Sequence, residues 1–558
     1  MPSGGDKTHR ILASAGFALP PGAKVISNGN YHPMNTITID IKTRSCASIK
    51  THGIFVYAQN KSTQVICVTV KKNSEPPVVW LPPELRRQEI VSISDDRLRQ
   101  MLEEAELIQA YDITTEFALW KYTLCRLYSW FPEVPIKKLS CIAARAAYLG
   151  MGYSRHDLFL QLNGDTPESS RGKVKKKFVP NQHLSEEELD AFISDCKKAT
   201  EFESSLADLF LELPPFEQNI WRAGLLMNDK GIFISRDLLD AKIAEDEQEI
   251  DDLNDEFKAV TGIKNPMNDL AFTEYVRAHS ISLKSLAEED VKKTFLALPE
   301  GIFRRMLEIR CRIAQIRHFD GKKILPMLNH DSRIQGLWEY YGTSAGEWNL
   351  KYLVGIEVLD EIARYSGDSM LYIEDFPELK SIVLTWLLDN EFVPPGRYAH
   401  CLLESCKSAV REPGNALYCG RIKISCFSRF LKFMLPSGRD IFLYDPKMGQ
   451  KQELRCQVRC GRQMMEKQMT GGYLLALIES AISRDILMSS VLNLIENGIS
   501  PVLMTEDEIL IDDDSDKDLF DDLDLVLEER PKWCEDIPYR AVPYLGAIWR
   551  KKPDKAGI

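Results

Sequence analysis

The sequence predicts a multidomain protein of mixed class: an α/β domain, then a helical region, then an α+β domain. Three observations support this prediction. The chain has 558 residues, 44% of them hydrophobic, and domains typically contain about 100 to 200 residues. Alternation of apolar and polar residues at period two, before residue 82, gives way to helical spacing. Long amphipathic helices dominate residues 214–340, and mixed patterns return after residue 341.

Composition excludes several classes of protein. No apolar run approaches the ~18 residues that a membrane-spanning helix needs, so we expect no membrane partner. Thirteen cysteines without C-x-x-C pairs, and no secretory signal at the N-terminus, favour reduced thiols in the cytoplasm. A net charge of −12 argues against a protein that coats nucleic acid nonspecifically, although it is compatible with a local basic groove.

The first predicted domain covers residues 36–213 and follows a flexible leader, residues 1–35. Residues 36–82 are rich in β-branched side chains and predict two or three strands, and helical spacing follows in "DDRLRQMLEEAE", "TTEFALWKYTLCRLYSWF" and "KLSCIAARAAYLGMG". The basic segment "SSRGKVKKKFVPNQ", with Lys175 and Lys176, predicts a loop. It is either a solvated charged loop or a loop that contacts phosphate.

The rest of the chain contains two long helical patterns and two hairpins. A helix is expected to end at Gly262, and another, starting near residue 471, at Gly498. "RFLKFMLPSGRDIFLYDP" predicts a hairpin that turns at residues 436–438. "ISPVLMTEDEILID" predicts strand, turn and strand, which places residues 506–508 at a tight turn.

Acidic residues at this turn allow two interpretations. Hairpin tips often carry Asp and Glu only for solubility. Alternatively, Asp507 is one carboxylate of a two-metal phosphoryl-transfer site, which needs hard oxygen ligands on rigid strands. "MLYIEDFPELKSIVLTWLLDNE" offers a second carboxylate, Asp375, at the end of an apolar strand. The two carboxylates could meet across a sheet.

Taken in order, these stretches resemble the phage-type family A DNA polymerases over nearly the whole chain after residue 35. Asp375-Phe376 and Asp507-Glu508 match the acids of the two palm motifs. The other matching stretches are "LPSGRDIFLYDP", "AISRDIL", "ERPKWCEDIPYRA", "FEQNIWRAGLLMNDKGIFISRDLL" and "TGIKNPMNDLAFTEYV".

The resemblance implies an RNase H-like, exonuclease-like domain over residues 36–213, a helical thumb over 214–340 and a polymerase palm over 341–558. In the palm it implies catalytic roles for Asp375, Asp507 and Glu508, with Mg held by Asp375 and Asp507. The DNA-binding cations would be Arg439 and Arg484 of the matching stretches, together with Lys175 and Lys176. Primer-template DNA is the implied partner.

The palm departs from the family pattern. Lys380 and Ile382 stand where the family has Glu and Arg, Glu506 stands where it has His, and Glu347 replaces an Arg that meets DNA phosphate. A carboxylate there repels the nucleic-acid backbone. The family's helical fingers domain is also missing, since the chain passes from "LTWLLDNEFVPPGRYAHCLLESCKSAVREPG" almost directly to the late hairpin. Without its cationic clamp, a triphosphate loses both orientation and transition-state stabilisation.

The exonuclease-like domain also departs from the family pattern. Asp40, Glu116 and Asp195 match three of the family's four metal-binding carboxylates, but Lys42 replaces an acid. A Lys ammonium competes with metal ions for carboxylates. Weak metal binding at most is therefore expected, and Asp40 with Lys42 is interpreted as a structural ion pair.

These departures predict a reduced, noncatalytic polymerase homologue that binds DNA, or a replication-associated protein, as a scaffold or regulator in the cytoplasm of a bacterial or phage-infected cell. One alternative is a residual magnesium-dependent DNA polymerase using Asp375 and Asp507, with a partner subunit supplying the cationic clamp. A second alternative is a protein-interaction module that has no contact with nucleic acid.

Overall fold

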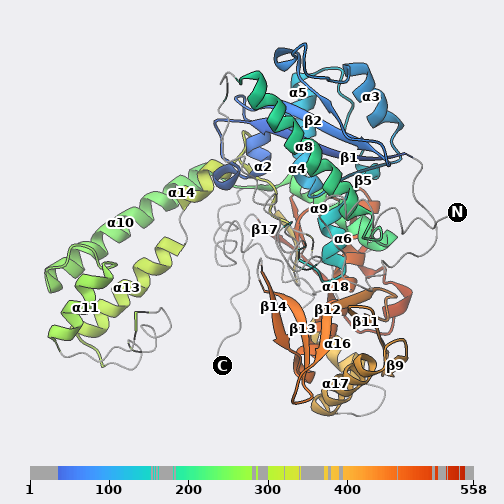
Figure 1. The fold of residues 1–558 in the computed structure, drawn as a ribbon. Helices are drawn as coiled ribbons and strands as arrows, with labels where there is room; N and C mark the ends of the chain where they lie inside the picture. The colour runs from blue at the N-terminus through green and yellow to red at the C-terminus, as the bar shows by residue number, and fades with distance from the viewer. Residues whose placement is uncertain are drawn as a thin grey trace. The chain divides into compact units, whose positions relative to one another are not determined.

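The structure is a computed structural model (Figure 1). Apart from single residues between these ranges, it describes residues 35–152, 184–279, 299–318, 321–338, 370–374, 379–388, 394–460, 463–504, 509–512, 526–539 and 541–546. The chain divides into two units. One consists of Met1–Gly231, Gln335–Asn349 and Leu371–Leu545, and the other consists of Ile232–Ile334 with Leu350–Met370 and Gly546–Ile558. In the described ranges, no helix combines the length and the apolar character needed to cross a membrane.

The first unit begins with a five-stranded mixed sheet of order β3-β2-β1-β4-β5. β1 pairs antiparallel with β2 and parallel with β4. The elements are β1 (Thr36–Arg44), α2 (Ile49–Gln59), β2 (Gln64–Lys72), β3 (Val78–Trp80), η1 (Pro83–Leu85), α3 (Asp95–Glu104), β4 (Leu107–Ala110), α4 (Ile113–Leu119), η2 (Trp120–Leu124), α5 (Cys125–Leu127), η3 (Ile136–Lys138), β5 (Leu139–Cys141), α6 (Ile142–Tyr148), α8 (Glu186–Ala207) and α9 (Pro215–Lys230).

Alternation along β1 determines which of its side chains face α8. Ile37, Ile39 and Ile41 point to one side of the sheet and are buried in a hydrophobic core. Asp40 therefore points to the other side, beneath α8, which packs across β1 and β2 (Figure 1). A hydrogen bond of 2.6 Å between the hydroxyls of Thr69 and Thr200 joins β2 to α8.

The same unit contains a second, α+β part with two sheets. A six-stranded antiparallel sheet has the order β14-β13-β12-β11-β10-β9, and a four-stranded sheet has the order β15-β16-β8-β17. The elements are β8 (Met370–Glu374), α16 (Leu379–Leu388), α17 (Pro395–Arg411), β9 (Ala416–Cys419), β10 (Ile422–Phe427), β11 (Phe430–Met434), β12 (Asp440–Met448), β13 (Leu454–Cys460), β14 (Gln463–Gln468), α18 (Gly471–Glu496), β15 (Pro501–Met504), β16 (Ile509–Asp512), η7 (Lys532–Cys534) and β17 (Val542–Gly546).

Helix α9 joins the two parts of this unit. Trp221 and Leu225 lie in the core of the α/β part. Ile220, Ala223 and Met227 lie in the core of the α+β part, which is built around the almost completely buried middle of α18. A helix with two apolar faces is buried from both sides, so α9 belongs to this unit rather than to the helical region.

The second unit is helical and contains β6 (Ile232–Phe233), α10 (Arg236–Thr261), α11 (Asp269–Ala278), α13 (Ile302–His318), α14 (Gly321–Ile324), η5 (Leu325–Met327) and β7 (Arg333–Ile334). α10 and α13 run antiparallel. Arg312 and Arg305 each form a two-pronged ion pair, with Glu249 and Glu256 respectively, at 2.6 to 2.9 Å. The acids and the arginines both recur every seven residues, which is the spacing that keeps such pairs on one helix face.

The predicted mixed α/β class is confirmed, as are the hairpin at residues 436–438, the ends of α10 and α18, and the two strands around residues 505–508. Two features differ from the prediction. The helical unit starts at Ile232 and ends at Ile334 rather than at 214 and 340, because α9 packs within the first unit. Residues 416–468 form a six-stranded sheet, of which only one hairpin was predicted.

Gly224 provides a test of the packing around α9. A Cβ atom at this position would lie 2.0 Å from the ring of Trp338. The backbone of Trp338 is fixed by the Asn228 side chain, which accepts a hydrogen bond of 2.6 Å from its N–H and donates one of 2.8 Å to its carbonyl. Gly224→Ala is therefore expected to destabilise the first unit by about 1–3 kcal/mol, the usual cost of overpacking. Thermal unfolding measures this loss. The control is Gly472→Ala in α18, where nothing lies within 4 Å of the added methyl group; equal melting temperatures for the two variants would contradict the packing described.

Candidate functional site

Three carboxylates meet in the α/β part, beneath α8. Asp40 lies on β1, Glu116 in the first turn of α4 and Glu203 near the end of α8. Their exposed fractions are only 1%, 6% and 1%. Burying several like charges together is costly unless cations or protons offset them. The structure contains both kinds of compensation.

Two cations lie directly against these carboxylates. The Lys42 ammonium is 2.6 Å from Oδ1 of Asp40, since residues two apart on a strand share a face. Arg155 forms an ion pair with Glu203, and its guanidinium lies over the ring of Tyr111, 4.9 Å from the centroid. Glu203 also accepts a hydrogen bond of 3.3 Å from the Tyr111 backbone N–H. We call Asp40, Lys42, Glu116, Arg155 and Glu203 the carboxylate cluster.

Protonation supplies the remaining compensation. Burial, with the nearby charges of Asp40 and Glu203, raises the pKa of Glu116 well above its ordinary value. Burial also raises the pKa of Glu203 to about 7, although Arg155 opposes this shift. Burial works against the charge on Lys42, but the adjacent Asp40 holds the pKa of Lys42 above its ordinary value. Near neutral pH, protons on Glu116 and partly on Glu203 therefore reduce the negative charge that Lys42 and Arg155 have to offset.

This arrangement does not fit the two metal ions that the family resemblance implies. Oδ2 of Asp40 is buried and has no hydrogen-bond partner. Lys42 lies against Oδ1 of Asp40 and Arg155 against Glu203, so two of the three carboxylates already have a cation that belongs to the chain. Within the described ranges, no three Asp, Glu, His or Cys side chains are arranged to hold a metal ion.

Asp195 does not join the carboxylate cluster. Its side chain is 55% exposed on α8 and pairs with Lys198 at 3.7 Å. The buried face of α8 instead follows Leu189, Ile193, Cys196, Thr200 and Glu203. Sequence reasoning missed Glu203, but a signal was present: it is the one acid in phase with the apolar stripe, because three- and four-residue steps follow one helix face.

The second candidate site is the pair of palm motifs. Asp375, Asp507 and Glu508 lie outside the described residues, but the strands that flank them are described. β8 ends at Glu374, immediately before Asp375, and β16 begins at Ile509, immediately after Glu508. β8 and β16 are hydrogen-bonded neighbours in the four-stranded sheet. The two acidic motifs therefore adjoin neighbouring strands.

The structure corrects the prediction that Arg439 and Arg484 contact DNA. Their side chains are 3% and 5% exposed. Arg484 forms a two-pronged ion pair with Glu217 at 2.8 and 2.9 Å, and Nε of Arg439 lies 2.6 Å from Asp485. Both guanidinium groups are therefore committed to buried carboxylates. Lys175 and Lys176 lie outside the described residues.

We call Glu217, Arg439, Arg484 and Asp485 the buried ion-pair network. Burial opposes ionisation of Glu217, but Arg484 and Arg439 outweigh it and lower the pKa of this carboxyl. Burial raises the pKa of Asp485, while the two arginines oppose that shift. Two acids and two guanidinium groups balance formally, and Ser437 donates a further hydrogen bond to Asp485. The network joins α9, α18 and the β11–β12 hairpin.

The raised pKa values in the carboxylate cluster predict a pH dependence of stability. The folded chain holds protons on Glu116 and Glu203 that the unfolded chain loses near pH 4.5, so stability falls as the pH rises from there to about 7, where Glu203 titrates. Glu116→Gln, which stays neutral, is expected to flatten the fall in melting temperature between pH 5 and pH 8. The exposed Glu187→Gln on α8 should leave it unchanged. Parallel profiles for wild type and Glu116→Gln would contradict this electrostatic account.

The chain is similar to a curated protein and to solved structures, but no protein-family model matches it. The chain is 22% identical over 348 residues to a DNA polymerase of Bacillus phage SP02. The match covers 56% of this chain and 50% of that protein, so the chain spans about half the length of this curated relative.

The second similarity is to a solved structure, the POL domain of Pol1 from M. smegmatis in complex with DNA primer-template and dNTP. The TM-score is 0.51 at 11% identity, and the match covers 98% of this chain and 99% of that one. At this identity the likeness concerns the fold. The chain is thus similar in sequence to a phage DNA polymerase over part of its length, and its mixed α/β fold resembles that of a Pol1 POL domain across nearly the whole chain.

Proposed function

We propose that this chain is a degenerate, noncatalytic family A polymerase homologue that binds DNA or a replication-associated protein as a scaffold or regulator. The observation that carries the proposal is the pair of cations, Lys42 and Arg155, that lie against Asp40 and Glu203 in the carboxylate cluster. The hydrophobic cores, by contrast, are continuous and well packed. This contrast suggests that the fold has been retained while its chemistry was lost.

The α/β part, residues 36–213, is proposed to be an exonuclease-like domain of RNase H-like fold. The order β3-β2-β1-β4-β5, with β2 and β3 antiparallel and β4 and β5 parallel to their neighbours, supports this proposal. Removal of a nucleotide by two metals needs a metal-bound nucleophile and charge stabilisation at the phosphate. Asp40 and Glu116, compensated by Lys42 and a proton, do not provide strong metal sites.

The helical unit is proposed to be thumb-like, and residues 341–558 a reduced palm without fingers. In the described residues between β8 and β9 there are two helices, α16 and α17. Neither contains an Arg-x-x-x-Lys pattern, which the family uses to hold the triphosphate. A leaving phosphate without such a clamp lacks stabilisation of its developing charge.

One observation favours a second candidate function. β8 and β16 are neighbours in one sheet, and Asp375 and Asp507 lie close to these strands in the sequence; a magnesium-dependent polymerase needs such carboxylates on rigid neighbouring elements. In this alternative, Asp375 and Asp507 hold Mg and Glu508 supports them, while a partner subunit supplies the missing cations. A third candidate, a protein-interaction module without nucleic-acid contact, is favoured by the net charge of −12.

Salt-dependent DNA binding tests the scaffold proposal. A fluorescently labelled primer-template is titrated with the full chain at several salt concentrations. We expect the logarithm of the affinity to fall linearly with the logarithm of salt concentration, because each phosphate contact releases counterions. An unlabelled duplex added in excess serves as the control for reversible binding. Absence of binding at low salt would refute the DNA scaffold and leave the protein-interaction candidate.

A further inference from the structure

Two pairs of free cysteines in the described part of the chain have thiols that are hydrogen-bonded to each other. One pair is Cys401 with Cys419, and the other is Cys67 with Cys196. The pairs differ in their access to solvent. Cys67 and Cys196 are both buried, with exposed fractions of 0% and 3%. In the first pair Cys419 is buried but Cys401 is exposed, so a reagent in solution reaches one of its two sulfur atoms.

Packing of α17 on β9 brings Cys401 and Cys419 together (Figure 1). Tyr398, three residues before Cys401 on α17, donates a hydrogen bond of 3.0 Å to the carbonyl of Cys419. Residues three apart on a helix are neighbours on its surface, so Cys401 lies beside the same strand end. Gly420 follows with a φ of +54°, and a Cβ atom there would lie 3.2 Å from Tyr398. The chain around Cys419 therefore passes close to α17, which keeps the two thiols in contact.

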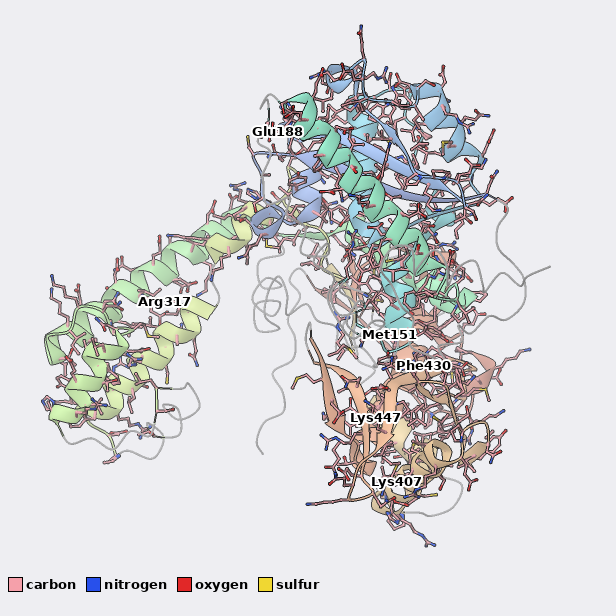
Figure 2. All side chains as sticks on the ribbon, viewed as in Figure 1. Met151, Glu188, Arg317, Lys407, Phe430 and Lys447 are labelled. Atoms are coloured by element: carbon pink, nitrogen blue, oxygen red, sulfur yellow. The ribbon has the colours of Figure 1, made fainter. Side chains whose placement is uncertain are left out.

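The two cysteines occupy different positions in their elements. Cys401 lies at the border of the buried face of α17, which includes Tyr398, Leu402 and Cys406. Figure 2 labels Lys407 further along the same helix. Cys419 is the last residue of β9 and the one buried residue of that strand. A reagent thus approaches Cys401 from the solvent side, while Cys419 contacts it from the protein side.

Their surroundings also give the two sulfur atoms different reactivity. The thiolate is the form of cysteine that attacks an oxidant. Burial, together with the neighbouring Cys401 thiol, raises the pKa of Cys419 to about 12. Cys419 therefore stays protonated in the reduced protein and does not start a reaction. Cys401, which solvent reaches, is the sulfur atom that meets the oxidant first.

We propose that Cys401 and Cys419 are a redox-sensitive pair that a hydroperoxide converts into a disulfide, which fastens β9 to α17. The Cys401 thiolate attacks one peroxide oxygen, so an S–O bond forms, the O–O bond breaks and the leaving oxygen takes a proton. The Cys419 sulfur then attacks the sulfenic sulfur of Cys401: the S–S bond forms, and the hydroxyl group leaves as water with the proton of Cys419. The two sulfur atoms lose the two electrons that the peroxide gains.

Mapping of disulfide-linked peptides tests the proposal. The full chain is treated with hydrogen peroxide without denaturant, its remaining thiols are alkylated, and it is digested with trypsin. Cys401 and Cys419 then lie on separate peptides, residues 398–407 and 412–421, whose link mass spectrometry detects. Fragmentation distinguishes Cys401 from Cys406 in the first peptide. We expect the link in wild type, its loss on reduction with dithiothreitol and its absence from Cys401→Ser. Cys46→Ser removes another exposed thiol and should leave the link unchanged.

Thermal unfolding tests whether the link fastens β9 to α17. A cross-link between residues 401 and 419 restricts the unfolded chain, so oxidised wild type is expected to melt a few degrees above the reduced protein. Cys401→Ser, treated in the same way, should show no such rise. Oxidised wild type that contains the link but melts no higher than the reduced protein would overturn the claim that the disulfide stabilises this contact.

The buried pair Cys67 and Cys196 serves as the internal control. Its thiols are in the same kind of contact, but no solvent reaches them, so we expect their link to form more than about tenfold more slowly. Equal rates for the two pairs would mean that peroxide reacts only with opened chains, and the inference would fail. Oxidation of Cys46 without a link between Cys401 and Cys419 would also overturn it. None of these results depends on DNA binding, so the proposed function stands or falls separately.

Discussion

The buried ion-pair network of Glu217, Arg439, Arg484 and Asp485 is the interaction on which the first unit depends. It connects α9, α18 and the β11–β12 hairpin, and α9 contributes apolar side chains to both cores. Losing one partner would leave an uncompensated charge in a dry interior, which typically costs about 3–5 kcal/mol. The two parts of the unit therefore depend on one balanced set of charges, and the arginines that balance it cannot also hold phosphate.

In the carboxylate cluster, too, groups of the chain itself offset the buried charges. Asp40, Glu116 and Glu203 are buried at the place where the family resemblance implies metal ions, and Lys42, Arg155 and protons offset their charge instead. A cation that belongs to the chain stabilises the fold permanently, whereas a metal ion is exchangeable and can activate water. Compensation from within the chain thus favours the folded state over catalysis.

Local patterns predicted much of the fold. The hairpin at residues 436–438 and the helix ends at Gly262 and Gly498 depend on turn and cap residues, which are visible in the sequence. The remaining strands of the six-stranded sheet were missed, because pairing between strands is a tertiary property. Asp40 and Glu116 were predicted to belong to one site, and the structure brings them together in the carboxylate cluster. Glu203 was missed because matching to a motif ignored the apolar stripe of α8, which Asp195 does not follow. Arg439 and Arg484 were assigned to DNA because a sequence does not reveal which cations are buried with acids.

The central claim is that the polymerase fold persists here without polymerase chemistry, and the length of an end-labelled primer tests it most directly. The full chain is incubated with primer-template, Mg²⁺ or Mn²⁺ and all four deoxynucleotides, beside an active polymerase as a control. An unchanged primer is the result that the account predicts. Extension that is lost in both Asp375→Asn and Asp507→Asn would contradict it, and shortening that is lost in Asp40→Asn would show that the carboxylate cluster still binds catalytic metal.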